Sequence, residues 1–257
     1  MELDGASSSQ KSGAQLRIGQ CYYWNGKNAE AIVELEKVQS IPGAHPHHIA
    51  DSLNHIGLAN VKLKKYDAAV AAFKKALAVP KVHRNNISVA QLGLGHCARE
   101  QNNYDEAIAE YQKVVDIPKV YPPHASDALR YIGICYYKQK KYPEAIKACE
   151  KCIAAKGAHP YHVYNSSMYI GHSLRNQKKY PEAVAAYEKA ATCTKKMHPH
   201  WVSDAHRYIG HVYLYNLKDY PKAKAAFEQV LNDKGAHPSH IKDAKNKLKK
   251  LEKLTKK

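Results

Sequence analysis

The sequence predicts an all-α fold: a solenoid of six helix–turn–helix repeats that ends in a capping helix. A glycine recurs at nearly constant intervals, and each interval contains two patterns of helical periodicity. The composition agrees, because 19 Tyr but only 2 Phe and 2 Trp in 257 residues favour many small cores over one large aromatic core.

Glycine sets the register of the repeat. The glycines follow one another at intervals of 38, 38, 38, 38 and 39 residues: Gly19, Gly57, Gly95, Gly133, Gly171 and Gly210. An alanine follows each glycine after twelve residues, or thirteen in the last unit, and a larger side chain follows four positions later. Two antiparallel helices approach closely only where side chains are small. These positions therefore predict the contact between the paired helices.

Each unit contains two helical patterns that are joined by a turn. In the second unit, apolar residues fall at helical spacing over 49–61, a turn follows at 64–67, and a second pattern covers 68–77. A tyrosine ends most turns, and an acidic residue or a Pro-Glu pair usually opens the second helix, as suits a helix N-terminus. The predicted repeats cover approximately 13–45, 46–83, 84–121, 122–159, 160–198 and 199–237.

The two ends of the chain differ from the repeats. Residues 1–12 have no apolar stretch of the kind that a secretory signal needs, and we expect a short disordered lead there. Residues 238–257 begin like another first helix but have Lys249 where the register requires glycine. We expect a Lys-rich capping helix and tail, because a repeat array ends in an element with a polar outer face.

The order of these residues resembles the tetratricopeptide repeat signature. Leu or Ile precedes the glycine, an aromatic residue ends the turn, Asp or Pro-Glu precedes the alanine, and a bulky residue is followed by a small one. The resemblance covers roughly residues 13–240 and implies a right-handed superhelical α-solenoid. The common repeat has about 34 residues, and these units are longer by a helical turn before the first helix. This long variant is similar to repeats in bacterial envelope-assembly and multiprotein-scaffold members of the family.

Histidines form two ladders along the repeats. The first runs through His45, His83, Tyr121, His159, His198 and His237, and the second lies three residues later. The candidate metal ligands in these ladders are His45, His48, His159, His162, His237 and His240. The alternative is structural: the first histidine caps a helix, and the second packs against the neighbouring repeat. Adjacent repeats stand about a helix pair apart, too far to share one ion tightly, and we predict no dedicated metal site.

Other chemical motifs are weak. Cys149 and Cys152 form a CxxC, but both occupy core positions of the repeat, which favours two buried small side chains. No paired carboxylates, Ser/His/Asp grouping or Gly-rich phosphate loop emerges. We therefore predict that the protein is not an enzyme and needs no cofactor.

The resemblance implies a partner-binding groove. In this family the first helices line a concave surface at positions six and three before the glycine and one, four and five after it. The candidate groove residues are Tyr23, Trp24, Asn54, His96, Arg99, Arg130, Tyr137, Asn165, His172, Arg175, Arg207, His211 and Tyr215. Tyr and Arg are typical of binding hot spots. Chaperone-binding relatives hold acidic tails with a clamp of Lys, Asn, Asn, Lys and Arg, and this sequence does not have that residue pattern.

The leading functional hypothesis is a protein–protein interaction scaffold that holds an acidic or polar partner segment in this groove. The net charge of +17 implies attraction to acidic partners. Two alternatives remain open. Open solenoids have heterologous ends, so copies could self-assemble into a filament or shell. The charge also suits nucleic acid, although no one-base-per-repeat code is visible.

The sequence also indicates a compartment. No apolar run approaches the length that spans a bilayer. Six Cys without a dense disulfide framework favour a reducing cytoplasm, although a mature exported form would look the same.

Overall fold

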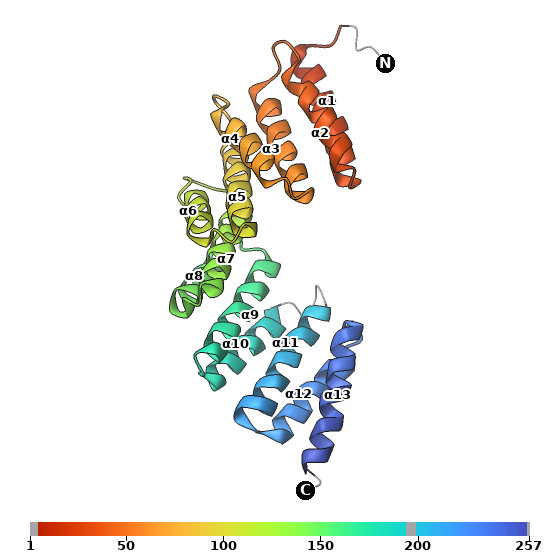
Figure 1. Ribbon diagram of the computed structural model, residues 1–257, viewed down its shortest axis with the longest axis vertical. Helices are drawn as coiled ribbons and strands as arrows, with labels where there is room; N and C mark the ends of the chain where they lie inside the picture. Colours follow the sequence, from red (N-terminus) through yellow and green to blue (C-terminus); the bar gives the residue numbers. More distant parts are fainter. Residues whose placement is uncertain (1–4, 194–198, 256–257) are drawn as a thin grey trace. The chain divides into compact units, whose positions relative to one another are not determined.

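The computed structural model describes residues 5–193 and 199–255, which form helices and no strand. A longer first helix and a shorter second helix follow each other repeatedly along the chain, as in a helical repeat solenoid (Figure 1). Two compact units are present, Met1–His124 and Ala125–Lys257. Within the two described ranges, no helix is long and apolar enough to cross a membrane.

Each repeat consists of a first and a second helix. In the N-terminal unit the pairs are α1 (Ser8–Trp24) with α2 (Asn28–Gln39), α3 (Pro46–Lys62) with α4 (Tyr66–Ala78), and α5 (Arg84–Glu100) with α6 (Tyr104–Val115). The next pairs are α7 (Pro122–Lys138) with α8 (Tyr142–Ala154), α9 (Pro160–Asn176) with α10 (Tyr180–Cys193), and α11 (Pro199–His211) with α12 (Tyr220–Asn232). The π-helix η1 (Val212–Leu217) extends α11, and α13 (Pro238–Thr255) ends the array.

The register glycines lie where the paired helices touch. A Cβ atom on Gly57 would lie closer than 3.0 Å to Phe73, and one on Gly171 would lie equally close to Tyr187. The side chains of Phe73 and Tyr187 are completely buried. The predicted close approach of first and second helices is therefore confirmed, and the bulky residue of the second helix fills the space that the missing Cβ leaves.

The turns inside the repeats use a left-handed residue. Lys64 has φ of 58° and Lys140 has φ of 61°, and residues at the same register position share this conformation. After α3, the N–H of Lys65 donates to the carbonyl of Asn60 at 2.9 Å, and the N–H of Lys64 donates to that of Val61 at 3.0 Å. This is a Schellman ending, which satisfies the last carbonyls of the first helix.

The sixth repeat has one residue more than the others between its glycine and its alanine. The π-helix η1 absorbs this residue between Gly210 and Ala223, because i→i+5 bonding fits an additional residue into the turn. Val212 and Leu214 remain buried, while Tyr215 is 45% exposed. The insertion thus keeps the core in register and presents Tyr215 on the surface.

The expected disordered lead is shorter than predicted. Helix α1 begins at Ser8, so residues 8–12 are helical. The Ser7 hydroxyl accepts from the N–H of Gln10, and the Gln10 side chain accepts from the N–H of Ser7, which forms a capping box. The buried Ser12 then contacts the next repeat. Residues 1–4 lie outside the described part of the chain.

We expect Gly133→Leu to lower the free energy of unfolding by about 1–3 kcal/mol, through overpacking. A Cβ at this position would overlap the Sγ atom of Cys149 on α8. Urea unfolding measures the loss. The milder pair Gly133→Ala and Gly133→Ala/Cys149→Ala tests the cause, because removing the sulfur should restore part of the stability. Additive losses would contradict this contact.

Candidate functional site

An aromatic stripe runs along the first helices of the C-terminal unit. We define it as Tyr137 on α7, Tyr169 and His172 on α9, Tyr208 and His211 on α11, and Tyr215 on η1. Ring centroids lie 5.2 Å apart for Tyr137 and Tyr169, 4.6 Å for His172 and Tyr208, and 5.9 Å for His211 and Tyr215. The rings meet edge to face, the geometry that aromatic quadrupoles favour. The stripe is therefore one connected surface across successive repeats.

Basic side chains lie over the rings of this stripe. The guanidinium groups of Arg175 and Arg207 lie 5.8 and 4.5 Å from the centroid of Tyr208. The amino groups of Lys247 and Lys250 on α13 lie 5.6 and 4.6 Å from the centroid of Tyr215. These are cation–π distances. The stripe thus combines aromatic area with positive charge.

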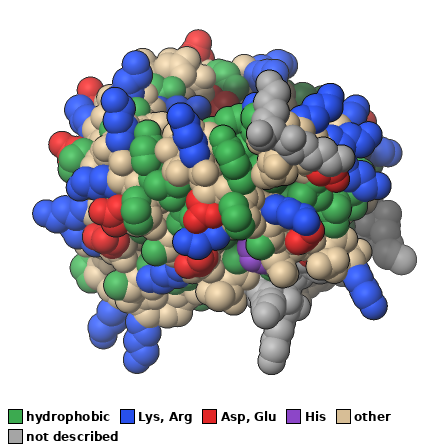
Figure 2. Space-filling model, turned by 90° about the horizontal axis from the view of Figure 1, so that it is seen from below, with side chains coloured by type: hydrophobic (Ala, Val, Ile, Leu, Met, Phe, Trp, Pro, Cys, Tyr) green, Lys and Arg blue, Asp and Glu red, His purple; other side chains and the backbone are tan. Residues whose placement is uncertain are grey.

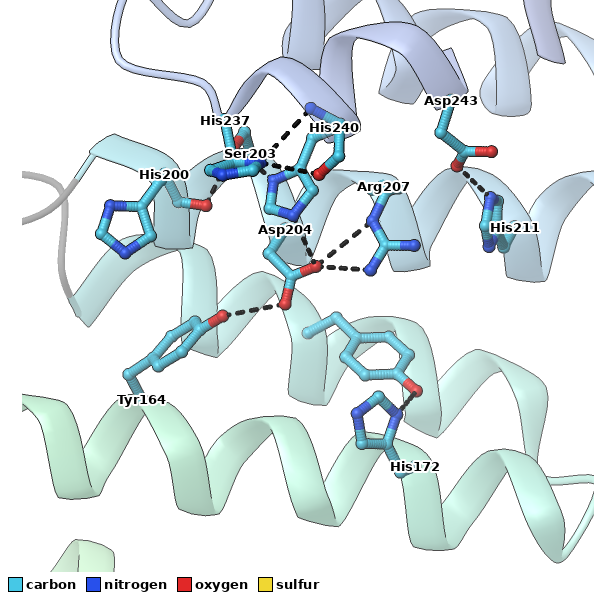
Figure 3. A network of polar contacts seen from close by, with 12 residues as sticks. Tyr164, His172, His200, Ser203, Asp204, Arg207, His211, His237, His240 and Asp243 are labelled. Atoms are coloured by element: carbon cyan, nitrogen blue, oxygen red, sulfur yellow. Dashed lines mark hydrogen bonds and ion pairs between the residues drawn. The ribbon is translucent and has the colours of Figure 1, made fainter. Parts of the chain in front are cut away.

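The charges of the stripe differ in how they are paired. Asp204 receives two hydrogen bonds from Arg207, at 3.2 and 2.6 Å, and one from Tyr164 at 3.2 Å (Figure 3). Lys247 lies 3.5 Å from Asp243. Arg175, by contrast, forms no ion pair with any residue that the structure describes. Its charge is therefore the one on α9 and α11 that is available to an anionic ligand.

Two predicted groove residues do not reach the surface. Arg130 is 5% exposed, donates to Asp127 at 3.1 Å and stacks over Tyr131 at 3.8 Å. Asn54 is 1% exposed and donates to the carbonyl of Asn86 in the next repeat at 3.0 Å. The groove prediction is wrong for both, because each side chain is used to join neighbouring helices.

The two histidines of the stripe are partly buried and hydrogen-bonded. His172 shares a 2.7 Å hydrogen bond between its Nδ1 atom and the Tyr187 hydroxyl. Burial, followed by the nearby charge of Arg175, lowers the pKa of His172 to about 4. His211 pairs with Asp243 at 2.7 Å (Figure 3), yet burial still lowers its pKa. Both rings are therefore neutral packing elements near pH 7.

The remaining predicted groove residues are not part of the aromatic stripe. Tyr23 and Trp24 contact the ring of His55 at 5.6 and 6.4 Å, and Trp24 is 68% exposed. His96 shares a 2.7 Å hydrogen bond with Tyr111, as His172 does with Tyr187. Arg99 pairs with Glu100 at 2.6 Å. Asn165 lies on α9 with its Oδ1 atom buried.

The first histidine ladder consists of helix caps. The Nδ1 atoms of His45, His83 and His159 accept from the backbone N–H two residues later at 3.2 Å, and that of His237 does so at 3.3 Å. The capping interpretation is confirmed for these four. His198 lies outside the described residues.

The second ladder joins neighbouring repeats through a partner that the sequence analysis missed. His48 bonds Ser12 at 2.8 Å, His162 bonds Ser126 at 2.8 Å and His240 bonds Ser203 at 3.0 Å. Where the ladder has Trp201, the serine position holds Tyr164, and the two rings stack at 5.1 Å. Where it has Asn86, that position holds Ala50. Each ladder residue thus varies together with its partner in the preceding repeat, a signal that comparison of the six repeats could have shown.

No metal centre is assembled from these groups. Among residues 5–193 and 199–255, no three His, Cys, Asp or Glu side chains are grouped so that they could hold an ion. Cys149 and Cys152 are free, fully buried thiols, and burial raises the pKa of Cys149 to about 12. Both cysteines therefore act as small core residues, as predicted.

We expect Ser12→Ala to destabilise the first repeat by about 1–3 kcal/mol, because it leaves the His48 ring without its hydrogen bond. The double variant Ser12→Ala/His48→Asn recreates the Ala–Asn pair of the next repeat and should recover at least half of the loss. Thermal unfolding and hydrogen exchange of the α1 amides measure both. The exposed His47→Asn is the control, and equal damage by single and double variants would contradict the pairing.

The low pKa of His172 makes stability depend on pH. Its ordinary value is 6.5 and its folded value is about 4, so between these values the unfolded chain binds a proton that the folded chain does not. Stability is complete above pH 6.5 and is lost as the pH falls toward 4. We expect His172→Gln to reduce the loss between pH 7 and pH 5 by on the order of 1–2 kcal/mol. Urea unfolding at both pH values measures it, and identical pH profiles would contradict it.

Comparisons with known proteins agree with this architecture. Tetratricopeptide repeat models match residues 14–41, 50–82, 85–157 and 166–200. A search of curated proteins found no match. Among solved structures, PilF of Pseudomonas aeruginosa is 18% identical over 91% of this chain and 97% of that chain, with a TM-score of 0.66. The apo form of RapI is 13% identical over 95% and 72%, with a TM-score of 0.72. MamA is 22% identical over 72% and 92%, with a TM-score of 0.56. The chain belongs to the tetratricopeptide repeat superfamily.

Proposed function

We propose that this protein is a non-enzymatic scaffold that binds an acidic or polar segment of another protein along the aromatic stripe. The family supports the general class, because tetratricopeptide repeat proteins bind other proteins. The observation that supports this surface in particular is the Arg175 guanidinium, which lies over Tyr208 without a carboxylate partner in the described part of the chain.

The chemistry of the stripe favours a partner with carboxylates. Arg175 can form paired hydrogen bonds with a carboxylate, and Lys250 adds a second positive charge beside Tyr215. The rings between them offer rigid, amphipathic area that costs little conformational entropy to order. A segment that crosses α9, α11 and η1 would therefore meet a cation at each end and aromatic side chains between them.

The net charge of the chain also favours an acidic partner. The chain has 40 Lys and Arg against 23 Asp and Glu, and basic side chains are spread over the face in Figure 2, with hydrophobic side chains between them. This charge should speed the encounter with an acidic partner. The short-range contacts of the stripe would then select the segment that stays bound.

A displayed library of random peptides tests this function with a defined probe. We expect selection on the full chain to enrich acidic sequences. The variant Arg175→Glu/Lys250→Glu should weaken their binding about 30-fold, equivalent to about 2 kcal/mol. Fluorescence anisotropy with the enriched peptides measures the change.

The matched control reverses two lysines on a second helix. Lys74→Glu/Lys75→Glu on α4 changes the net charge by the same amount at exposed positions and should weaken binding by less than about threefold, through long-range attraction only. Equal losses in the two variants would show that net charge, and not the stripe, holds the peptides. Failure to enrich acidic peptides would contradict the proposed function.

A further inference from the structure

A second surface of the C-terminal unit has features of a binding site. A hollow of about 570 Å³ lies between α8, α9 and α10, within the size range of ligand pockets. Its apolar lining includes Ile153 of α8, Ile170 and Leu174 of α9 and Ala186 of α10. Helical periodicity places Ile170 and Leu174 on the side of α9 away from Tyr169 and His172. The hollow is therefore separate from the aromatic stripe.

Comparison of the six repeats explains why the hollow exists. In the first repeat, Gln15 on α1 donates at 2.9 Å to the carboxylate of Glu34 on α2. The same two register positions in the fifth repeat hold Ser167 and Ala186, which both line the hollow. Every other repeat has at least one larger residue there: Leu53 with Ala72, Gln91 with Glu110, Leu129 with Ala148 and His206 with Ala226. The fifth repeat thus lacks the side chain that fills this space elsewhere.

Ser167 lies four residues before Gly171, on the face of α9 that packs against α10. Ser167 is 1% exposed, and its hydroxyl has no hydrogen-bond partner among the described residues. Burying an unpaired hydroxyl costs free energy. A leucine, as at Leu53 and Leu129, would avoid this cost and fill the hollow. Ser167 is thus not the most stabilising residue for this position, a common feature of functional sites.

The charges at the hollow indicate what kind of partner it fits. Glu150 of α8 and Glu182 of α10 line it, and neither forms an ion pair with a residue in the described ranges. Lys189 is the third charged residue in the lining. Two carboxylates and one amino group therefore border the apolar hollow, so its rim carries more negative than positive charge. This rim favours a ligand with positive charge next to an apolar group.

We propose that this hollow is a docking socket for a basic segment of another protein, which inserts one large apolar side chain between Lys or Arg residues. The apolar side chain occupies the space over Ser167, Ile170 and Leu174. The flanking basic groups pair with Glu150 and Glu182. This surface selects the opposite charge from the aromatic stripe, so the two faces of α9 can hold different segments at the same time.

The test uses a displayed library of helical peptides, selected on the full chain. We expect the enriched peptides to carry a large apolar residue flanked by Lys or Arg. Ser167→Leu, which fills the hollow, should weaken them at least tenfold. Glu150→Lys/Glu182→Lys should do the same, whereas the charge-matched Glu30→Lys/Glu36→Lys on α2 should weaken them less than threefold. Arg175→Glu/Lys250→Glu should leave this binding intact.

A second variant that fills the hollow makes the test independent of how well leucine packs there. Ser167→Gln/Ala186→Glu transplants the Gln15–Glu34 pair of the first repeat and fills the hollow while adding negative charge. Both filled variants should melt at or above the wild-type temperature and lose the peptides. Peptides that bind them as tightly as wild type would overturn the proposal, as would a failure to enrich basic peptides. If light scattering shows that wild type self-associates and Ser167→Leu does not, the occupant is a second copy and the proposed partner is wrong.

Discussion

The close contact between the two helices of each repeat is the constraint on which the rest of this structure depends. Gly171 brings α9 against α10 so tightly that Tyr187 fills the place of a missing Cβ. The contact fixes the rotation of each first helix about its axis. Once that rotation is fixed, the periodicity of the helix decides which residues meet the neighbouring repeat and which form the outer surfaces.

Contacts between neighbouring repeats combine apolar packing with matched side-chain pairs, and these pairs give the contacts specificity. A buried serine and a half-buried histidine satisfy each other, as Ser126 and His162 do, whereas a stacked pair, Tyr164 and Trp201, replaces them one repeat later. Mixing members of the two kinds of pair would leave a polar group unsatisfied or a space unfilled. The matched pairs therefore favour one order of the repeats.

The sequence predicts the backbone of this protein better than its surfaces. Glycine spacing, tyrosine at the turn and Pro at the helix start are local signals, and the helices follow them closely. The fate of a side chain is not local. Arg130 and Arg207 have the same register position and the same neighbours in sequence, Asp three residues before and Tyr one after. Nevertheless Arg130 is buried, and Arg207 lies beside the stripe over Tyr208. Pairing with Asp127 or Asp204 could be predicted from the i, i+3 spacing, but exposure depends on contacts between repeats.

Helix α9 shows how one repeat can gain surfaces without loss of the fold. Its contact with α10 uses Gly171, the stripe uses Tyr169 and His172, and the proposed socket depends on Ser167. Tyr169 and His172 point away from the face of α9 that carries both Ser167 and Gly171, so a change in the stripe leaves the contact with α10 in place. A repeat array adds to this freedom, because each repeat mainly contacts its neighbours. A change at Ser167 therefore acts mainly on its own repeat and its neighbours while the more distant repeats keep their packing, which is why a binding surface can arise locally in the array.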